Sequence, residues 1–298
     1  MIIDCHAHLE ERLLPVDQLL KKMDACGIDR TALMAPMCDP IPETGPLLIK
    51  LFHFLLTHGS LRWAARFMAA RFTPEGDIKL PAGAYSIYQD PDNALVFEAV
   101  DKHPDRFFGW IFVNPRGNND PVKEYERWKD HPGAIGVKAH PFWHRYAPEA
   151  LVPVARAAAT DGRPLLIHVG FGEHGRFEDL VTQVPGLKLI LAHAGFPEYA
   201  DTWRKIAGNR NILVDVSQTS YVGKKILADV VRALGVDRCC YGTDGPFGFH
   251  DEQGTFDMCR IKKRIERLLP DAADRRKILG DNFAAFANLP FNFEEPRS

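Results

Sequence analysis

Two histidines lie two residues apart near the start of the chain, in the stretch MIIDCHAHLE. In an extended strand the side chains alternate between two faces, so His6 and His8 point the same way while Cys5 and Ala7 point the other way. Two imidazoles that converge on one point can bind a divalent metal ion. An isolated pair of this kind can also lie on a solvated strand face, so its interpretation depends on the residues that accompany it.

Further nitrogen and oxygen donors occur at the ends of later apolar runs. They are Lys138 in GVKAHP, His168 in LLIHVG, His193 in LAHAG and Asp244 in YGTDGP. Taken singly, each histidine could be a hydrogen-bonded core residue and the aspartate a turn residue. Their convergent use in proteins is a divalent metal site of the zinc type. Because His168, His193 and Asp244 end apolar runs and Lys138 lies on another, the set predicts one shared metal site.

The elements that must position these donors are eight short, β-rich apolar runs separated by stretches of helical periodicity. The runs are 2–8, 31–36, 107–114, 134–141, 165–169, 187–195, 212–217 and 238–246. The clearest helical stretches are 15–27, 121–130, 150–161, 177–184 and 223–234. Strands that alternate with helices imply right-handed crossovers and a parallel sheet.

Eight such units predict an α/β fold, a closed (β/α)8 TIM barrel, in which catalytic residues lie at the carboxyl ends of the strands. Most strands follow one another after about 24 to 30 residues, as one strand and one crossover helix require. The interval from the second to the third strand is longer, so residues 40–104 should contain a helical insertion, centred on a helical hairpin over 46–72. It could be a satellite core, a lid or a homodimer contact. We expect one domain over 1–290 and a loose tail over 291–298.

Composition narrows the class of protein further. The chain has 298 residues, of which 46% are hydrophobic and 26% charged, with a formal net charge of -2. This balance disfavours nucleic acid as a partner, and no stretch approaches the roughly 18 apolar residues of a membrane span. We interpret the six cysteines as reduced thiols and expect a cytoplasmic protein without a signal peptide and with a small-molecule substrate.

The motifs DCHAHL, GVKAHP, LLIHVG, LAHAG, YGTDGP and ILGDNFAAF follow in this order from Ile2 to about Leu289. Together they resemble the signatures of the metal-dependent amidohydrolase superfamily, specifically its amidohydrolase 2 branch of TIM-barrel hydrolases and decarboxylases. Only residues 40–104 have no assignment in this resemblance. It implies that the metal is held by His6, His8, His168 and Asp244, with His193 beside it as a further ligand or as a catalytic acid or base.

Lys138 leaves the number of ions open. In some relatives a lysine on the fourth strand is carboxylated and bridges two metals, whereas in others it neutralises a substrate or a carboxylate. Its structural alternative is a buried ion pair. We expect a divalent ion, zinc by the donor types, and favour one ion over two.

The resemblance supports two reactions. In the first, metal-activated water attacks an ester, lactone or amide carbonyl, Asp244 transfers the proton, and His193 stabilises the oxyanion or shares the proton transfer. In the second, a carboxylate substrate binds the metal and undergoes nonoxidative decarboxylation. Several decarboxylase relatives have glutamate in place of the first histidine, so His6 favours hydrolysis.

Loops after the middle strands combine aromatic and basic side chains, which suits a small acidic or ring-bearing substrate. The candidate substrate-binding residues are Arg116, Lys138, His140, Trp143, Arg145 and Arg176. Two other functions are less favoured. Gly170–Gly175 matches G-x-G-x-x-G, but it follows the fifth strand instead of the first, which argues against an NAD-binding oxidoreductase. A non-catalytic barrel with a structural metal would need a closed ligand set.

Overall fold

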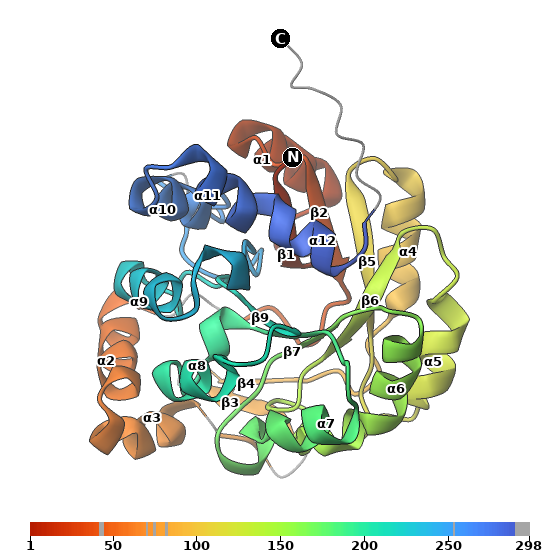
Figure 1. Cartoon of the computed structure of the whole chain (residues 1–298), viewed down its shortest axis with the longest axis horizontal. Coiled ribbons are helices and arrows are strands. Elements are labelled where there is room, and N and C mark those ends of the chain that lie inside the picture. The colour runs from red at the N-terminus through yellow and green to blue at the C-terminus, as the bar shows by residue number, and fades with distance from the viewer. Residues whose placement is uncertain (42–44, 70, 74–75, 81–82, 253, 290–298) are drawn as a thin grey trace.

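Eight parallel strands form one sheet that curves into a nearly closed barrel (Figure 1). The computed structural model describes residues 1–41, 45–69, 71–73, 76–80, 83–252 and 254–289. In sheet order the strands are β1 (Ile3–His8), β2 (Arg30–Met34), β5 (Phe107–Phe112), β6 (Ala134–Ala139), β7 (Leu165–Ile167), β8 (Leu189–Leu191), β9 (Ile212–Asp215) and β10 (Cys239–Cys240). Each of the eight predicted runs overlaps one of these strands, so the predicted TIM barrel is confirmed.

The barrel closes between its first and last strands. The backbone N–H of Cys5 donates to the carbonyl of Tyr241 at 3.0 Å, and the N–H of Asp244 donates to the carbonyl of His6 at 2.7 Å. These bonds continue the parallel ladder from β1 to the segment after β10. As a result, the first and last candidate metal ligands come from adjacent positions in the ring.

Helices surround the sheet, as the crossovers of a parallel barrel require (Figure 1). They bury one apolar face each; in α9, for example, that face consists of Ile226, Leu227 and Val230. The crossover helices are α1 (Val16–Cys26), α4 (Asn93–Lys102), α5 (Pro121–Trp128), α6 (Val152–Thr160), α7 (Phe177–Gln183), α8 (Ala200–Ile206) and α9 (Lys224–Leu234), and β10 is followed by α10 (Arg260–Leu268), α11 (Ala272–Arg276) and α12 (Asn282–Phe286).

The segment between β2 and β5 contains additional elements. They are α2 (Pro46–Thr57), α3 (Arg62–Ala69) and an antiparallel pair, β3 (Ile78–Leu80) and β4 (Gly83–Tyr85). Phe52 of α2 packs on Phe196 and Tyr221, whose ring centroids lie 6.1 and 6.4 Å away. The segment therefore covers loops that follow β8 and β9.

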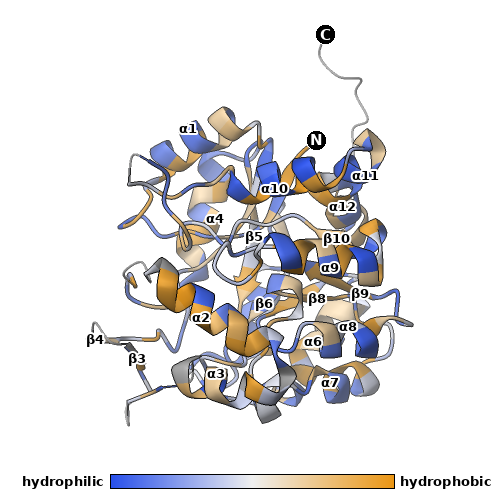
Figure 2. Ribbon diagram, turned by 90° about the vertical axis from the view of Figure 1, so that its left-hand side faces the viewer, coloured by the Kyte–Doolittle hydropathy of each residue, from blue (hydrophilic) through white to orange (hydrophobic). Residues whose placement is uncertain are grey.

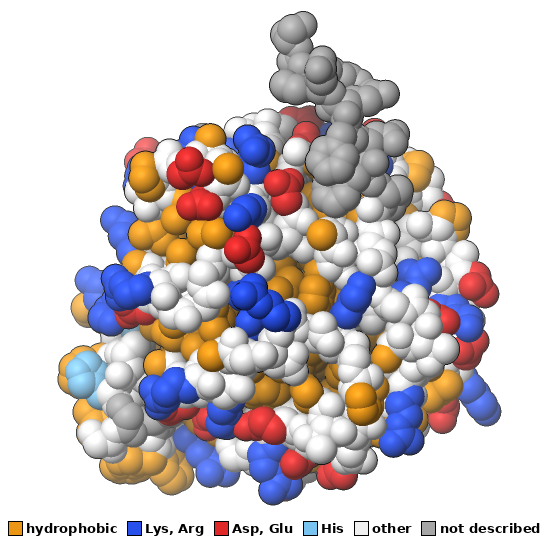
Figure 3. Space-filling view, in the orientation of Figure 1, with side chains coloured by type: hydrophobic (Ala, Val, Ile, Leu, Met, Phe, Trp, Pro, Cys, Tyr) orange, Lys and Arg blue, Asp and Glu red, His pale blue; other side chains and the backbone are white. Residues whose placement is uncertain are grey.

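The helices α2 and α3 of this segment carry many hydrophobic residues, coloured orange in Figure 2, and several of them are exposed. Leu47, Trp63 and Phe67 are 81%, 64% and 67% exposed, and hydrophobic side chains gather over α3 in the space-filling view (Figure 3).

The homodimer expected through this segment stays a prediction, and the tail expected over 291–298 lies outside the described residues. Over the rest of the face in Figure 3, basic and acidic side chains are interspersed. None of the described helices is long and apolar enough to cross a membrane.

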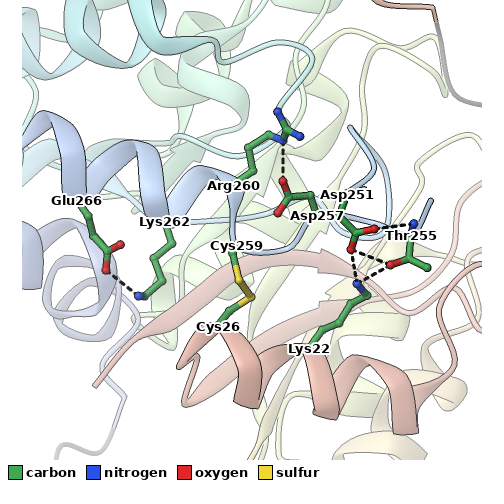
Figure 4. Close-up of a disulfide and its surroundings, with 9 residues drawn as sticks. All are labelled: Lys22, Cys26, Asp251, Thr255, Asp257, Cys259, Arg260, Lys262 and Glu266. Atoms are coloured by element: carbon green, nitrogen blue, oxygen red, sulfur yellow. Dashed lines mark hydrogen bonds and ion pairs between the residues drawn. A yellow bond between two sulfur atoms is a disulfide. The ribbon is translucent and has the colours of Figure 1, made fainter. Parts of the chain in front are cut away.

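A disulfide joins Cys26 at the end of α1 to Cys259 at the start of α10 (Figure 4). Their Cα atoms are 5.3 Å apart although 233 positions separate them in the chain. The interpretation of all six cysteines as thiols is therefore wrong for this pair. The spacing of the two residues could not show the contact, because only closure of the barrel brings the first helix beside the helix that follows the last strand. Cys5, Cys38, Cys239 and Cys240 are buried free thiols.

This disulfide should be detectable by thiol counting and by thermal unfolding. The denatured protein should expose four thiols before reduction and six after it. Reduction, or Cys26→Ser, should lower Tm by about 5 to 15 °C, because the cross-link restricts the unfolded chain over most of its length. Reductant should not change the Tm of the Cys26→Ser variant. Six thiols without reduction, together with an unchanged Tm, would show that the bond does not form.

Candidate active site

Six donors converge at the carboxyl-terminal mouth of the barrel. His6 and His8 lie on β1 and Lys138 lies on β6, whereas His168, His193 and Asp244 follow β7, β8 and β10. All six side chains belong to residues that are at most 7% exposed. The predicted convergence of these residues is therefore present in the structure.

Asp244 links the two histidines of β1. Its Oδ1 lies 3.1 Å from Nε2 of His6 and 3.5 Å from Nε2 of His8, and the three side chains form a group that could hold a metal ion. Its Oδ2 accepts a hydrogen bond from Nε2 of Gln218 at 2.8 Å. The Nδ1 atom of His8 donates to the carbonyl of Ala35 at 3.3 Å, which leaves its Nε2 directed at the carboxylate.

His168 and His193 form the opposite side of the group. Nδ1 of His168 lies 3.1 Å from Nε2 of His193, and the ring of His140 lies 4.1 Å from the ring of His168. Nε2 of His168 is buried and has no hydrogen-bond partner among the described residues. A buried polar atom without a partner is costly, so this nitrogen is an open position for a ligand.

Asp215 and Ser217 also belong to the site, although we did not single them out in the sequence. Asp215 ends β9 with 0% exposure, and its Oδ2 accepts from Nδ1 of His6 at 2.9 Å. Ser217 Oγ lies 2.8 Å from Nδ1 of His193. A usable signal was present: the seventh apolar run ends in Asp-Val-Ser, which places the two polar side chains on one face.

Three residues of the site have a left-handed backbone conformation, which side chains other than glycine rarely adopt. The φ angles are 54° at His193, 64° at Gln218 and 58° at Asp244. Such residues cost about 1 to 3 kcal/mol each and persist where the surroundings hold them. Here the backbone N–H of His193 donates to Asp215 Oδ1 at 3.0 Å. The strained turns therefore depend on the same polar network as the side chains.

Burial sets the charge state of most of these groups. It lowers the pKa of Lys138 to about 8, against the opposing effect of Asp244 and Asp215. It also lowers the pKa of His193 to about 4 and holds that of His168 well below its usual value. Burial would raise the pKa of Asp244, but the nearby His193 and His6 outweigh it, and that pKa lies well below normal. The pKa of His6 is raised instead, because Asp215 and Asp244 outweigh burial and Lys138. The site therefore combines an ionised carboxylate with neutral imidazoles at His168 and His193 and a more basic one at His6.

The donor set fits a divalent cation. His6, His8 and His168 each have Nδ1 engaged by a protein atom. Nε2 of His6 and of His8 faces the Asp244 carboxylate, and Nε2 of His168 is left without a partner among the described residues. Neutral imidazole nitrogens held in this way, together with one carboxylate, are typical ligands of zinc and similar ions. His140 does not fit as a ligand through Nδ1, because that atom accepts from the backbone N–H of Trp143 at 3.1 Å.

The candidate substrate-binding residues fall into two groups. Trp143 packs its ring 5.2 Å from that of His140, which places both next to the histidine cluster. Arg116 donates to the carbonyl of Arg145 at 2.9 Å, and the guanidinium of Arg145 lies 5.3 Å from the ring of Phe72. Arg176 instead is 63% exposed and pairs with Asp179 of α7. The structure brings His140 and Trp143 to the cluster and gives Arg176 a partner on its own helix.

The G-x-G-x-x-G motif over Gly170–Gly175 does not lie where a dinucleotide-binding loop would. Gly172–Gly175 forms a single 3-10 turn between β7 and α7. A dinucleotide-binding loop would instead connect the first strand and helix of the sheet. Its position therefore agrees with a loop at the mouth of the barrel.

With this geometry established, comparison with known proteins identifies the family. The family model Amidohydro_2, described as amidohydrolase, matches residues 3–286, and the chain belongs to this family, which uses a divalent metal. None of the curated proteins compared with the chain matches it significantly. The predicted family resemblance is confirmed.

Solved structures with the same fold include hydrolases, hydratases and decarboxylases. The 4-oxalomesaconate hydratase from Rhodopseudomonas palustris is 16% identical with a TM-score of 0.62, covering 97% of this chain and 96% of its own. A protein described as a 2-pyrone-4,6-dicarboxylic acid hydrolase from Pseudomonas putida is 16% identical with a TM-score of 0.58, covering 98% of both chains. The 5-carboxyvanillate decarboxylase from Novosphingobium aromaticivorans, solved with bound manganese, is 18% identical with a TM-score of 0.57, covering 91% of this chain and 80% of its own. At these identities the likeness concerns the fold.

The buried histidines should make the metal-free protein sensitive to mild acid. Burial lowers the pKa values of His8, His140, His144, His168 and His193, with His144 and His193 at about 4, whereas that of His6 is raised. Between pH 6.5 and 4 the unfolded chain therefore binds more protons than the folded one, and stability falls as pH falls.

We expect the Tm of the metal-free protein to fall by about 5 °C or more from pH 6.5 to 4.5, measured by calorimetry. The His144→Gln variant, which cannot take up that proton, should show a shallower fall. A Tm that stays level or rises across this window would contradict the assignment of the buried histidines as neutral.

Proposed function

We propose that this protein is a metal-dependent hydrolase of a carboxylic ester, lactone or amide bond in a small acidic or ring-bearing substrate. One observation carries the proposal: His6, His8 and Asp244 form a buried group that could hold a metal ion, and His168, which contacts the adjacent His193, has a buried Nε2 without a partner among the described residues. The position of these groups at the mouth of the barrel, where such folds perform catalysis, supports an enzymatic role over a structural one.

The proposed ion is zinc or a similar divalent metal, held by His6, His8, His168 and Asp244. When bound, such an ion lowers the pKa of water to about 7 and polarises a carbonyl. Asp244 would be both a ligand of the ion and a proton acceptor, so its carboxylate could alternate between binding the ion and transferring a proton. One ion remains our preferred stoichiometry, and carboxylation of Lys138 would be needed for a bridge between two.

Asp244 is the proposed general base. Its Oδ2 is held by Gln218, so the carboxylate keeps its orientation while Oδ1 accepts a proton from the attacking water. The same oxygen then delivers that proton to the leaving group. Because the pKa of Asp244 is held well below normal, it starts the cycle ionised.

His193 is the proposed partner on the opposite side. It lies next to His168 and under the ring of Tyr221, whose centroid is 5.4 Å from that of His193. The Nδ1 atom of His193 is engaged by Ser217, so its Nε2 is the nitrogen that can accept a proton and share the proton transfer with Asp244. Its low pKa means that it starts the cycle neutral near pH 7.

The aromatic rings around the cluster support a flat substrate. Phe196 stacks on Tyr221 at 4.3 Å, and both rings meet His168 edge to face. His140 accepts at Nδ1, so its Nε2 carries the hydrogen and can donate to a substrate oxygen. Lys138, Arg116 and Arg145 are proposed to balance the charge of an acidic substrate.

Nonoxidative decarboxylation of an aromatic or unsaturated acid is the second candidate. The stacked rings of Phe196 and Tyr221 beside the cluster suit an aromatic acid, and the fold is shared with a decarboxylase as well as a hydrolase. In that reaction Asp244 would first accept a proton from water and then deliver it to the ring carbon as the bond to the leaving carbon dioxide breaks. His6 at the first metal position favours hydrolysis.

Metal content and activity should depend together on His6. The purified protein should contain about one divalent ion per chain, with two as the upper bound, and His6→Ala should lose both the ion and the activity. The matched control is His103→Ala, which replaces a histidine that precedes β5 at the opposite end of the barrel. Metal content would be measured by mass spectrometry alongside activity. Full activity of the His6→Ala variant would refute the proposed site.

A substrate screen on the same preparation should separate the two reactions. Lactones, acyl amides and aromatic carboxylic acids would be tested with parallel detection of released acid and released carbon dioxide. We expect acid release that stops when the metal is removed by chelation and returns when it is restored. Carbon dioxide release alone would replace the hydrolase proposal with the decarboxylase.

A further inference from the structure

Asp215 is a buried carboxylate for which the proposed chemistry has no use. Its Oδ2 accepts from Nδ1 of His6 at 2.9 Å. Its Oδ1 accepts from the backbone N–H groups of His193 and Ser217, both at 3.0 Å, and from the hydroxyl of Ser217. The Asp215 carboxylate thus joins three parts of the barrel: His6 on β1, the segment after β8 and the segment after β9.

Through its hydroxyl, Ser217 connects Asp215 to His193 and determines which nitrogen of His193 carries a hydrogen. A serine hydroxyl has one hydrogen, and because it is donated to Asp215, the oxygen can only accept from other groups. Nδ1 of His193 lies 2.8 Å from that oxygen and must therefore carry a hydrogen. Nε2 of His193 is then a bare nitrogen.

The same argument extends to His168. The bare Nε2 of His193 lies 3.1 Å from Nδ1 of His168, so that Nδ1 donates its hydrogen. This leaves Nε2 of His168 without a hydrogen, and it is the buried atom without a partner described above. His6 is oriented directly, since its Nδ1 hydrogen is held by Asp215 and its Nε2 faces Asp244.

We propose that Asp215 and Ser217 are positioning residues that determine which ring nitrogen carries the hydrogen in His6, His193 and His168. The inference rests on the proposed metal site, because its consequence is that the ligands His6 and His168 both present Nε2 to the cation. A neutral imidazole can bind a metal only through the nitrogen that carries no hydrogen. Asp215 also lies within ligand distance of His6 and His193, but in this proposal it acts through the histidines and does not bind the cation.

Gly242 allows the network to form. A Cβ at this position would lie 3.0 Å from the Cβ atoms of both His6 and Ser217, closer than ordinary contacts permit. A side chain there would separate β1 from the end of β9. The hydrogen bonds between the two segments, which include the 3.3 Å contact of Ser217 Oγ with Nδ1 of His6, require this close approach.

The test compares Ser217→Ala with the wild type in the metal-free state. Long-range proton–nitrogen NMR spectra of histidine-labelled protein report which ring nitrogen is protonated. We expect His193 to carry hydrogen on Nδ1 and His168 to carry it on Nδ1 in the wild type, and both preferences to weaken in the variant. Zinc affinity, measured by competition with a chromophoric chelator, should fall about 10- to 100-fold. Asp215→Asn should show the larger effect.

The matched control is Thr202→Val, which removes another buried hydroxyl whose bond to the carbonyl of Gly195 lies outside the network. It should lower Tm to a comparable extent while the histidine spectra and the zinc affinity stay unchanged. Unaltered ring protonation in Ser217→Ala, or an equal loss of zinc affinity in Thr202→Val, would overturn the proposal. If the wild type shows the expected ring protonation but binds no zinc, the proposed metal site fails and the positioning assignment stands.

Discussion

The structure depends on the burial of imidazole, amine and carboxylate groups together at one end of a closed barrel. Charges and polar atoms removed from water are costly unless partners of matching chemistry surround them. Here each carboxylate is matched to histidines: Asp244 to His6 and His8, and Asp215 to His6. Nε2 of His168 is one of several buried polar atoms without a hydrogen-bond partner among the described residues, and it is the one that the proposed cation would satisfy.

Barrel closure creates this arrangement and explains its distribution along the chain. The donors come from positions 6 to 244, and they meet because parallel strands present their carboxyl ends at one side of the sheet. The backbone bonds between β1 and the segment after β10 bring Asp244 beside His6. On the outside of the same junction, the Cys26–Cys259 disulfide joins the helices that follow these two strands. Closure and site geometry are therefore coupled.

Most of the fold and the donor set could be predicted from local patterns. Short apolar runs such as 165–169 and 212–217 indicate buried strands, so the strands could be located. The residues at the ends of these runs then identified His168, His193 and Asp244 as candidate donors. Asp215 and Ser217 also end an apolar run, but their role depends on His6 and His193, partners that are distant in sequence. The disulfide was missed for the same reason, since it depends on a contact across 233 positions. Arg176 pairs with the neighbouring Asp179, and its role as a substrate contact stays a prediction.

The central claim is that one cation unites the histidines of β1 with His168 and Asp244. Anomalous X-ray diffraction from crystals of protein purified without chelator, recorded on both sides of the absorption edge of the metal, tests it directly. The account predicts one strong anomalous peak within coordination distance of Nε2 of His6, His8 and His168 and of the Asp244 carboxylate. An anomalous peak bound by other residues, or metal-free density in which these four side chains bond only to one another, would contradict it.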